Sequence, residues 1–184
     1  DLGQPKALAA AQALQAAHPE VRVEPQVQRL TPANAAELIA AHDLILDCAD
    51  SYAVTYTLSD LCLAEGKPLI SASALGFGGY VGGFCGPAPS YRALFPDPPA
   101  QAQTCATAGV LGPVVAMVGA MQAQLALAQL LGLAPNPLGQ MITTDLRSYR
   151  FASFRFDGAP EPAQAFRFIA ASQITARLAL TARF

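Results

Sequence analysis

Apolar and polar residues follow two different periods along this chain, and each period predicts a different kind of element. Residues 5–17 carry apolar side chains at helical spacing and predict a helix. Residues 21–27 alternate valine with polar residues, which predicts a half-buried strand with Pro25 at an edge or bend. Residues 31–42 predict a second helix that begins with Thr31 as its N-cap.

The next segment gives the clearest sign of a parallel sheet. Residues 43–50, DLILDCAD, form a continuous apolar run of the kind that is buried on both faces of a parallel sheet. A helix follows from about Tyr52 to Ala64 and ends at Gly66, and residues 67–75 resume as a strand. This alternation is typical of βαβ units, so we expect an α/β fold with a Rossmann-like, mostly parallel, doubly wound sheet.

After Leu75 the pattern changes to a period of two. Residues 76–84 alternate aromatic residues with glycines, and residues 144–156 alternate apolar with polar residues. Both stretches predict antiparallel strands at the end of the sheet. A proline-rich loop and a long apolar helix, whose start is set by Pro113, lie between them.

Composition narrows the class of protein. The chain has 184 residues, of which 53% are hydrophobic and only 13% are charged, so it can bury a substantial core. The net charge of -2 provides no basic stripe, which argues against nucleic-acid binding. Four cysteines without a CxxC pair indicate reduced thiols in a cytoplasmic protein, with Cys48 as a small core residue. We predict one domain over residues 1–157, then a linker and short tail over 158–184.

One stretch raises the question of a membrane. Residues 109–132 are uncharged and long enough to span a bilayer. Gln122, Gln124 and Gln129 interrupt the stretch, alanine dominates it, and no basic or aromatic residues flank it. These features favour a buried helix of a soluble protein, with membrane insertion as the alternative.

The glycines within residues 76–83 invite comparison with a phosphate-binding loop. Such a loop must open a helix directly after a strand, whereas here another alternating strand follows. A bulged or tightly packed strand is therefore favoured over a phosphate cradle.

Several side chains could carry chemistry. Asp47, Asp50 and Ser51 follow a predicted strand, and ligands bind beyond the carboxyl ends of strands in open α/β sheets. Two carboxylates there suit Mg²⁺, although Asp50 or Ser51 could equally cap the next helix. Cys105 precedes a helix start, where a thiol can become nucleophilic, or it is a bystander. Lys6, near the start of a helix, is by itself an ordinary surface charge.

Six motifs in series resemble the ThiF/MoeB/HesA adenylyltransferases, the bacterial relatives of ubiquitin-activating E1 enzymes. They are Asp1-x-Gly3-x-Pro5-Lys6, residues 43–50, residues 66–71, residues 91–99 (YRALFPDPP), Thr104-Cys105 and residues 108–115 (AGVLGPVV). The resemblance runs to about Phe156. It implies use of ATP and Mg²⁺ to adenylate the C-terminal glycine of a ubiquitin-like sulfur carrier of the ThiS or MoaD kind, in thiamine or molybdopterin synthesis. It also implies a homodimer. From the charge and composition above we expect no nucleic-acid or membrane partner.

The resemblance assigns roles to individual residues. Lys6 matches the lysine that contacts the ATP phosphates. Asp50 matches the aspartate that holds Mg²⁺ and is essential for adenylation, and Ser51 stands in place of its usual asparagine neighbour. Cys105 matches the crossover-loop cysteine that in some members bonds to the carrier after adenylation. Asp47 is expected to support the site.

Two departures from the family pattern lead to further expectations. The family's glycine-rich nucleotide loop, ribose-binding acid and site arginines have no match before Asp1, so we expect negligible activity from this chain alone. Many relatives hold structural zinc with two CxxC pairs; Ser90 and Ala93 replace the first pair, and residues 159–166 contain no cysteine for the second. We therefore predict no structural zinc. The competing hypothesis is a truncated, non-catalytic remnant that still binds the carrier.

Overall fold

The computed structural model describes residues 2–99, 108–163 and 168, and it divides the chain into two compact units. The first unit ends at Leu30 and contains helix α1 (Lys6–Ala17), as predicted. Residues 21–27 do not form a strand, so that prediction was wrong. Alternation favours an extended chain, but a strand also needs a neighbour for its N–H and C=O groups, and Pro25 has no N–H to donate.

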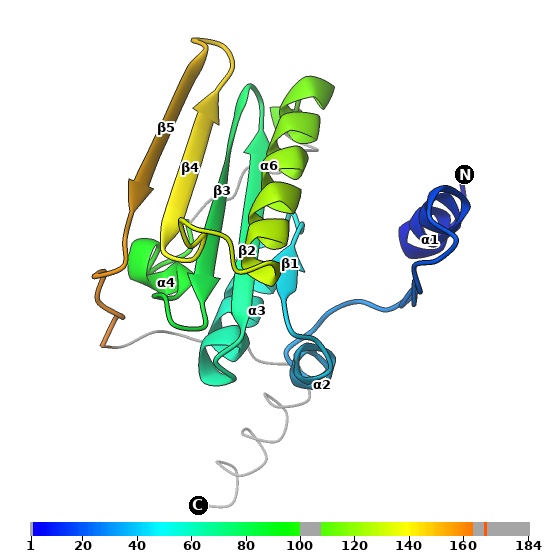
Figure 1. Cartoon of the computed structure of the whole chain (residues 1–184), viewed down its shortest axis with the longest axis horizontal. Coiled ribbons are helices and arrows are strands. Elements are labelled where there is room, and N and C mark those ends of the chain that lie inside the picture. Colours follow the sequence, from blue (N-terminus) through cyan, green and yellow to red (C-terminus); the bar gives the residue numbers. More distant parts are fainter. Residues whose placement is uncertain (1, 100–107, 164–167, 169–184) are drawn as a thin grey trace, which may run out of the picture. The chain divides into compact units, whose positions relative to one another are not determined.

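The second unit begins at Thr31 and is built on a five-stranded sheet with the order β1-β2-β3-β4-β5 (Figure 1). The strands are β1 (Ile45–Asp47), β2 (Pro68–Leu75), β3 (Gly78–Cys85), β4 (Gln140–Asp145) and β5 (Arg150–Arg155). β1 and β2 are parallel, and the remaining neighbours pair antiparallel. The α/β fold with antiparallel strands at its end is confirmed, and in the described residues the parallel part is the β1–β2 pair.

The helices of this unit are α2 (Ala35–Ala40), α3 (Tyr52–Ala64), α4 (Tyr91–Leu94) and α6 (Gly112–Leu130). α3 has the predicted bounds. α2 begins later than predicted because Asn34, not Thr31, is its N-cap. The Thr31 main-chain N–H and hydroxyl both donate to Asn34 Oδ1, at 2.8 and 3.1 Å, and hold the preceding residues in a turn instead of a helix.

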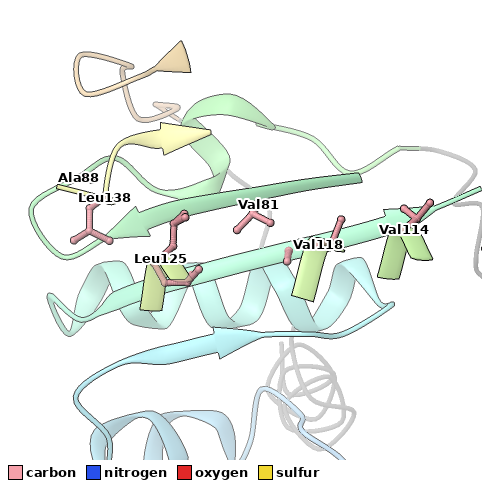
Figure 2. Close-up of a cluster of buried hydrophobic side chains, with 8 residues drawn as sticks. Val81, Ala88, Val114, Val118, Leu125 and Leu138 are labelled. Atoms are coloured by element: carbon pink, nitrogen blue, oxygen red, sulfur yellow. The ribbon is translucent and has the colours of Figure 1, made fainter. Parts of the chain in front are cut away.

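The two faces of the sheet have separate cores. α6 lies in front of the sheet in Figure 1 and α3 behind it. The core under α6 contains aliphatic side chains of the sheet, of α6 and of the loops: Ile70, Ala72, Val81, Ala88, Val114, Val118, Leu125 and Leu138. Figure 2 labels Val81, Ala88, Val114, Val118, Leu125 and Leu138 of this cluster. The other face holds an aromatic cluster in which Tyr91 contacts Tyr56, Phe84 and Phe95.

By length and composition, α6 could cross a membrane, and it is the one such helix among the described residues. Its inner side packs on β2 and β3, and Gln122 from that side makes hydrogen bonds to main-chain carbonyls of β1 and β2. This packing buries one side of α6, and 28% of its apolar window is buried. The outer side exposes Val115 and Leu127 at 47% and 53%.

β1 is shorter and more exposed than its apolar sequence predicted. It has three residues, and Leu46 is 43% exposed. The expected burial on both faces was wrong because α6 packs on β2 and β3, and the face of β1 that carries Leu46 is left partly exposed.

The glycines of β3 allow close packing, as predicted. A Cβ atom at Gly79 would lie 2.5 Å from the main-chain oxygen of Ser73 and 2.8 Å from Cγ2 of Val118. β3 pairs with β2 without interruption from Gly78 to Cys85. The glycine-rich stretch is therefore a tightly packed strand without a bulge, and it does not form a loop at a helix start.

Candidate functional site

A cavity of about 280 Å³ lies beyond the carboxyl end of β1. It exists because β1 ends at Asp47, which pairs with Ser71, whereas β2 continues to Leu75. The exposed edge of β2, the start of α3 and the middle of α6 line the cavity. Small-molecule sites usually measure roughly 300–1,000 Å³, so the described residues form a small site or part of a larger one.

Asp50 and Ser51 line this cavity together, directly before α3. Ser51 is the N-cap residue by its backbone, and its carbonyl accepts hydrogen bonds from the N–H groups of Val54 and Thr55 at 3.0 and 3.1 Å. Its side chain makes no capping hydrogen bond in the described structure, and Asp50 precedes the cap and is exposed. Helix capping by these side chains is thus not supported, and a carboxylate and a hydroxyl face the cavity beside the positive end of the α3 dipole.

Asp47 is buried behind the cavity, with 1% of its surface exposed. Its carboxylate accepts hydrogen bonds from the Ser71 hydroxyl at 2.9 Å and from the Ala49 N–H at 3.1 Å. Burial raises the pKa of Asp47 above its usual value of 3.8, and the hydrogen bonds, including one with Thr55, oppose that rise. Asp47 therefore organises the turn that leads to Asp50 and does not itself line the cavity.

Cys48 corrects one prediction, because it is exposed and lines the cavity instead of joining the core. The pKa of the Cys48 thiol is raised, mainly by burial and to a smaller extent by the negative charge of Asp47. The protonated thiol donates a hydrogen bond to Oε1 of Gln122 at 3.3 Å. A raised pKa makes Cys48 a poor nucleophile at neutral pH.

Two further residues complete the site, and sequence reasoning did not identify either of them. Gln122 of α6 and Tyr80 of β3 both line the cavity. The Tyr80 hydroxyl donates to that of Tyr91 at 3.0 Å, and burial raises the pKa of Tyr80, so it stays protonated at neutral pH. The available signal for Gln122 was a polar residue on the buried side of an apolar helix.

The cavity, which lies in the second unit, does not test two of the predicted site residues. Lys6 is the first residue of α1, where its side chain is exposed, and it lies in the first unit. Cys105 lies outside the described residues. The structure thus brings together Asp50 and Ser51, with Asp47 behind them, and the roles of Lys6 and Cys105 stay predictions.

Solved structures of MccB resemble this chain in fold. A crystal structure of Escherichia coli MccB with MccA-N7isoASN superposes on 89% of this chain and 52% of that chain with a TM-score of 0.72. At 14% sequence identity, this similarity establishes the shared fold.

Sequence comparison gives the family. Residues 1–164 match the ThiF family, and the chain belongs to that family. It is 40% identical over 163 residues to a sulfur carrier protein adenylyltransferase of Thermus thermophilus, covering 84% of this chain and 59% of the relative. It is 41% identical over 146 residues to the bovine adenylyltransferase and sulfurtransferase MOCS3, covering 78% of this chain and 32% of the relative.

The chain therefore spans 59% and 32% of the lengths of these two curated relatives. The family membership predicted from the six motifs is confirmed. The relatives' names place this chain in a family of adenylyltransferases, a class of enzymes that uses ATP.

Proposed function

We propose that this chain contributes the Asp50 side of the active site of an ATP-dependent adenylyltransferase. The substrate would be the C-terminal glycine of a ubiquitin-like sulfur carrier of the ThiS or MoaD kind, in thiamine or molybdopterin synthesis. The observation that carries the proposal is the cavity at the end of β1, where Asp50 and Ser51 face the space before α3. Family membership supplies the class of reaction.

The residues around the cavity fit a magnesium ion bound with phosphate. Mg²⁺ is usually held by one or two carboxylates together with substrate phosphates, and Asp50 supplies an exposed carboxylate. Ser51 can add a hydroxyl because its side chain does not cap α3 in the described structure. When bound, the ion would neutralise negative charge on the triphosphate.

The chain's own groups would act mainly by positioning and electrostatics. Adenylation is attack of the carrier's terminal carboxylate on the α-phosphorus of ATP, with pyrophosphate leaving, so two anions must approach each other. The N-terminus of the 13-residue helix α3 provides a positive potential at the cavity. Lys6 is proposed to contact the phosphates.

Pyrophosphate exchange on the complete protein, with ATP, Mg²⁺ and a carrier, tests this function. Asp50→Asn removes the charge without changing the size of the side chain, and we expect at least a 100-fold loss of exchange. Asp43→Asn, at an exposed aspartate before β1, is the matched control and should keep the wild-type rate. Wild-type exchange by Asp50→Asn would refute the assignment.

Cys105→Ala separates adenylation from thiol chemistry. If Cys105 bonds to the carrier after adenylation, as proposed, the variant keeps pyrophosphate exchange but no longer forms a covalent adduct with the carrier. The adduct is visible as a reducible band on a non-reducing gel. An adduct in Cys105→Ala would show that another group accepts the carrier.

The competing function is that of a non-catalytic remnant that only binds the carrier. Residues 1–184 by themselves, supplied with ATP, Mg²⁺ and carrier, are proposed to release negligible pyrophosphate, and robust turnover would refute this. Exchange by the complete protein favours the enzyme, whereas carrier binding without exchange favours the remnant. A cytoplasmic location and a homodimer are also proposed, the latter testable by sedimentation.

A further inference from the structure

Gln122 makes an unusual set of contacts for a residue of an apolar helix. It is 4% exposed, and its Nε2 donates to the main-chain oxygens of Asp47 at 2.8 Å and Ile70 at 3.0 Å. Its Oε1 accepts the hydrogen bond from Cys48. Both amide protons are therefore used, and all three partners belong to β1, to β2 or to the residue that follows β1.

These contacts fix the end of β1 from the α6 side. Asp47 is the last residue of β1, and Ile70 lies on β2 opposite Leu46. One side chain thus ties two neighbouring strands to each other and to the helix that covers them. A primary amide can do this because it presents two donors and one acceptor in a plane.

The opposite side of the same turn is held by the carboxylate of Asp47, through Ser71 and the Ala49 N–H. The main chain at Asp47 and Cys48 is therefore held from both faces of the sheet. Asp50 comes two residues after Cys48, is exposed and lines the cavity.

We propose that Gln122 is a positioning residue for the Asp50 carboxylate, and this inference rests on the proposed adenylation function. Gln122 lines the cavity, but in this scheme it acts through the turn that carries Asp50. It holds the carbonyl of Asp47 and the thiol of Cys48 so that the next turn presents Asp50 to a divalent cation. Residues that orient metal ligands typically change metal affinity or activity by 10–100-fold when they are replaced.

The test compares Gln122→Met with Gln124→Met in the complete protein. Methionine keeps the length of glutamine and removes its hydrogen bonds, and Gln124 is exposed on the same helix. For Gln122→Met we expect about a 10-fold higher half-saturating Mg²⁺ concentration and a roughly 10- to 100-fold lower kcat in pyrophosphate exchange, with an unchanged KM for the carrier. Gln124→Met should match the wild type in all three. Gln122→Glu, which loses both donors and places a negative charge against two carbonyls, should be at least as impaired.

Two measurements do not depend on turnover. Mn²⁺ binding in the presence of ATP, followed by electron paramagnetic resonance, should weaken about 10-fold in Gln122→Met and not in Gln124→Met. Hydrogen exchange of the amides of residues 49–51 should accelerate in Gln122→Met alone. Wild-type Mn²⁺ affinity and amide exchange in a folded Gln122→Met would overturn the inference, even if its melting temperature were lower.

Asp50→Asn distinguishes the two possible failures. Suppose that Asp50→Asn abolishes pyrophosphate exchange and Mn²⁺ binding while Gln122→Met changes neither. The inference about Gln122 is then wrong and the proposed function stands. If Asp50→Asn changes neither, the proposed function is wrong and the positioning role falls with it.

Discussion

The carboxylate of Glu161 accepts two hydrogen bonds of 2.6 Å from Ser90, one from its main-chain N–H and one from its hydroxyl. Ser90 is 1% exposed and also caps α4, because its Oγ accepts from the N–H of Arg92 at 3.1 Å. A single carboxylate thus ties the segment that follows β5 to the start of α4, and it satisfies two donors that would otherwise be buried without partners.

Glu161→Ala should therefore destabilise the chain by about 1–3 kcal/mol, the usual cost of leaving buried donors unsatisfied. Glu161→Gln keeps one oxygen as an acceptor and should lose less. Urea unfolding measures both. Glu65→Ala, at an exposed glutamate just after α3, is the control and should be close to neutral. Equal stability of Glu161→Ala and the wild type would show that this tie contributes nothing.

The same contact bears on the predicted absence of structural zinc. By the family resemblance, Ser90 stands where many relatives are expected to have a zinc-binding cysteine, and here Ser90 is hydrogen-bonded to the carboxylate of Glu161. The described residues contain no group of three or more His, Cys, Asp or Glu side chains that could hold a metal. We predict substoichiometric zinc by mass spectrometry of the purified protein and no change in melting temperature with EDTA. One zinc per chain would contradict this.

Asp47 should make stability depend on pH. Because its pKa in the folded protein is raised, the native state binds a proton more tightly than the unfolded chain does. Its contribution to stability is therefore present below its usual pKa of 3.8 and is lost as the pH rises through the higher folded value. A tenfold difference in proton affinity between the native and unfolded states corresponds to about 1.4 kcal/mol of unfolding free energy.

Asp47→Asn removes this titration while keeping the size of the side chain. We expect the unfolding free energy of the variant, relative to wild type, to increase from about pH 4 upward until Asp47 is fully ionised. Asparagine also alters the hydrogen bonds to Ser71 and Ala49, which shifts the unfolding free energy by a constant amount. This shift does not change how the difference between variant and wild type varies with pH. Urea titrations of both proteins across this range measure it, and parallel curves would refute the prediction.

Two glycines that differ in the space around them, Gly79 in β3 and Gly119 in α6, should respond in opposite ways to alanine. Gly79→Ala places a methyl group against the Ser73 carbonyl and Val118, and should destabilise by about 1–3 kcal/mol. Gly119→Ala, in the exposed middle of α6 with no atom within 4 Å of the added methyl, should stabilise by about 0.5–1 kcal/mol. Thermal unfolding compares them. A neutral Gly79→Ala would mean that β3 can move away from α6.

Local patterns were enough to identify most elements and half of the site. The helix Tyr52–Ala64 and the strands β2, β3 and β5 follow from periodicity and from glycine and proline positions, whereas most of β4 lies before the predicted stretch 144–156. The alternation of residues 21–27 misled because a strand exists only with a partner. The apolar run at β1 misled because burial depends on what covers each face of a strand, and α6 packs on β2 and β3 and leaves Leu46 partly exposed.

The sequence by itself determined the family, the succession of β1, α3, β2, β3 and α6, and the placement of Asp50 and Ser51 after a strand, because these depend on neighbours along the chain. Only the tertiary structure decided that Ser51 leaves its side chain free of the helix cap, that Cys48 faces the cavity, and that Gln122 holds the end of β1. The physical reason is that the residues of these contacts lie far apart along the chain. Gln122 and Asp47 are 75 residues apart, and no local period records a hydrogen bond that forms only when a helix packs on a sheet.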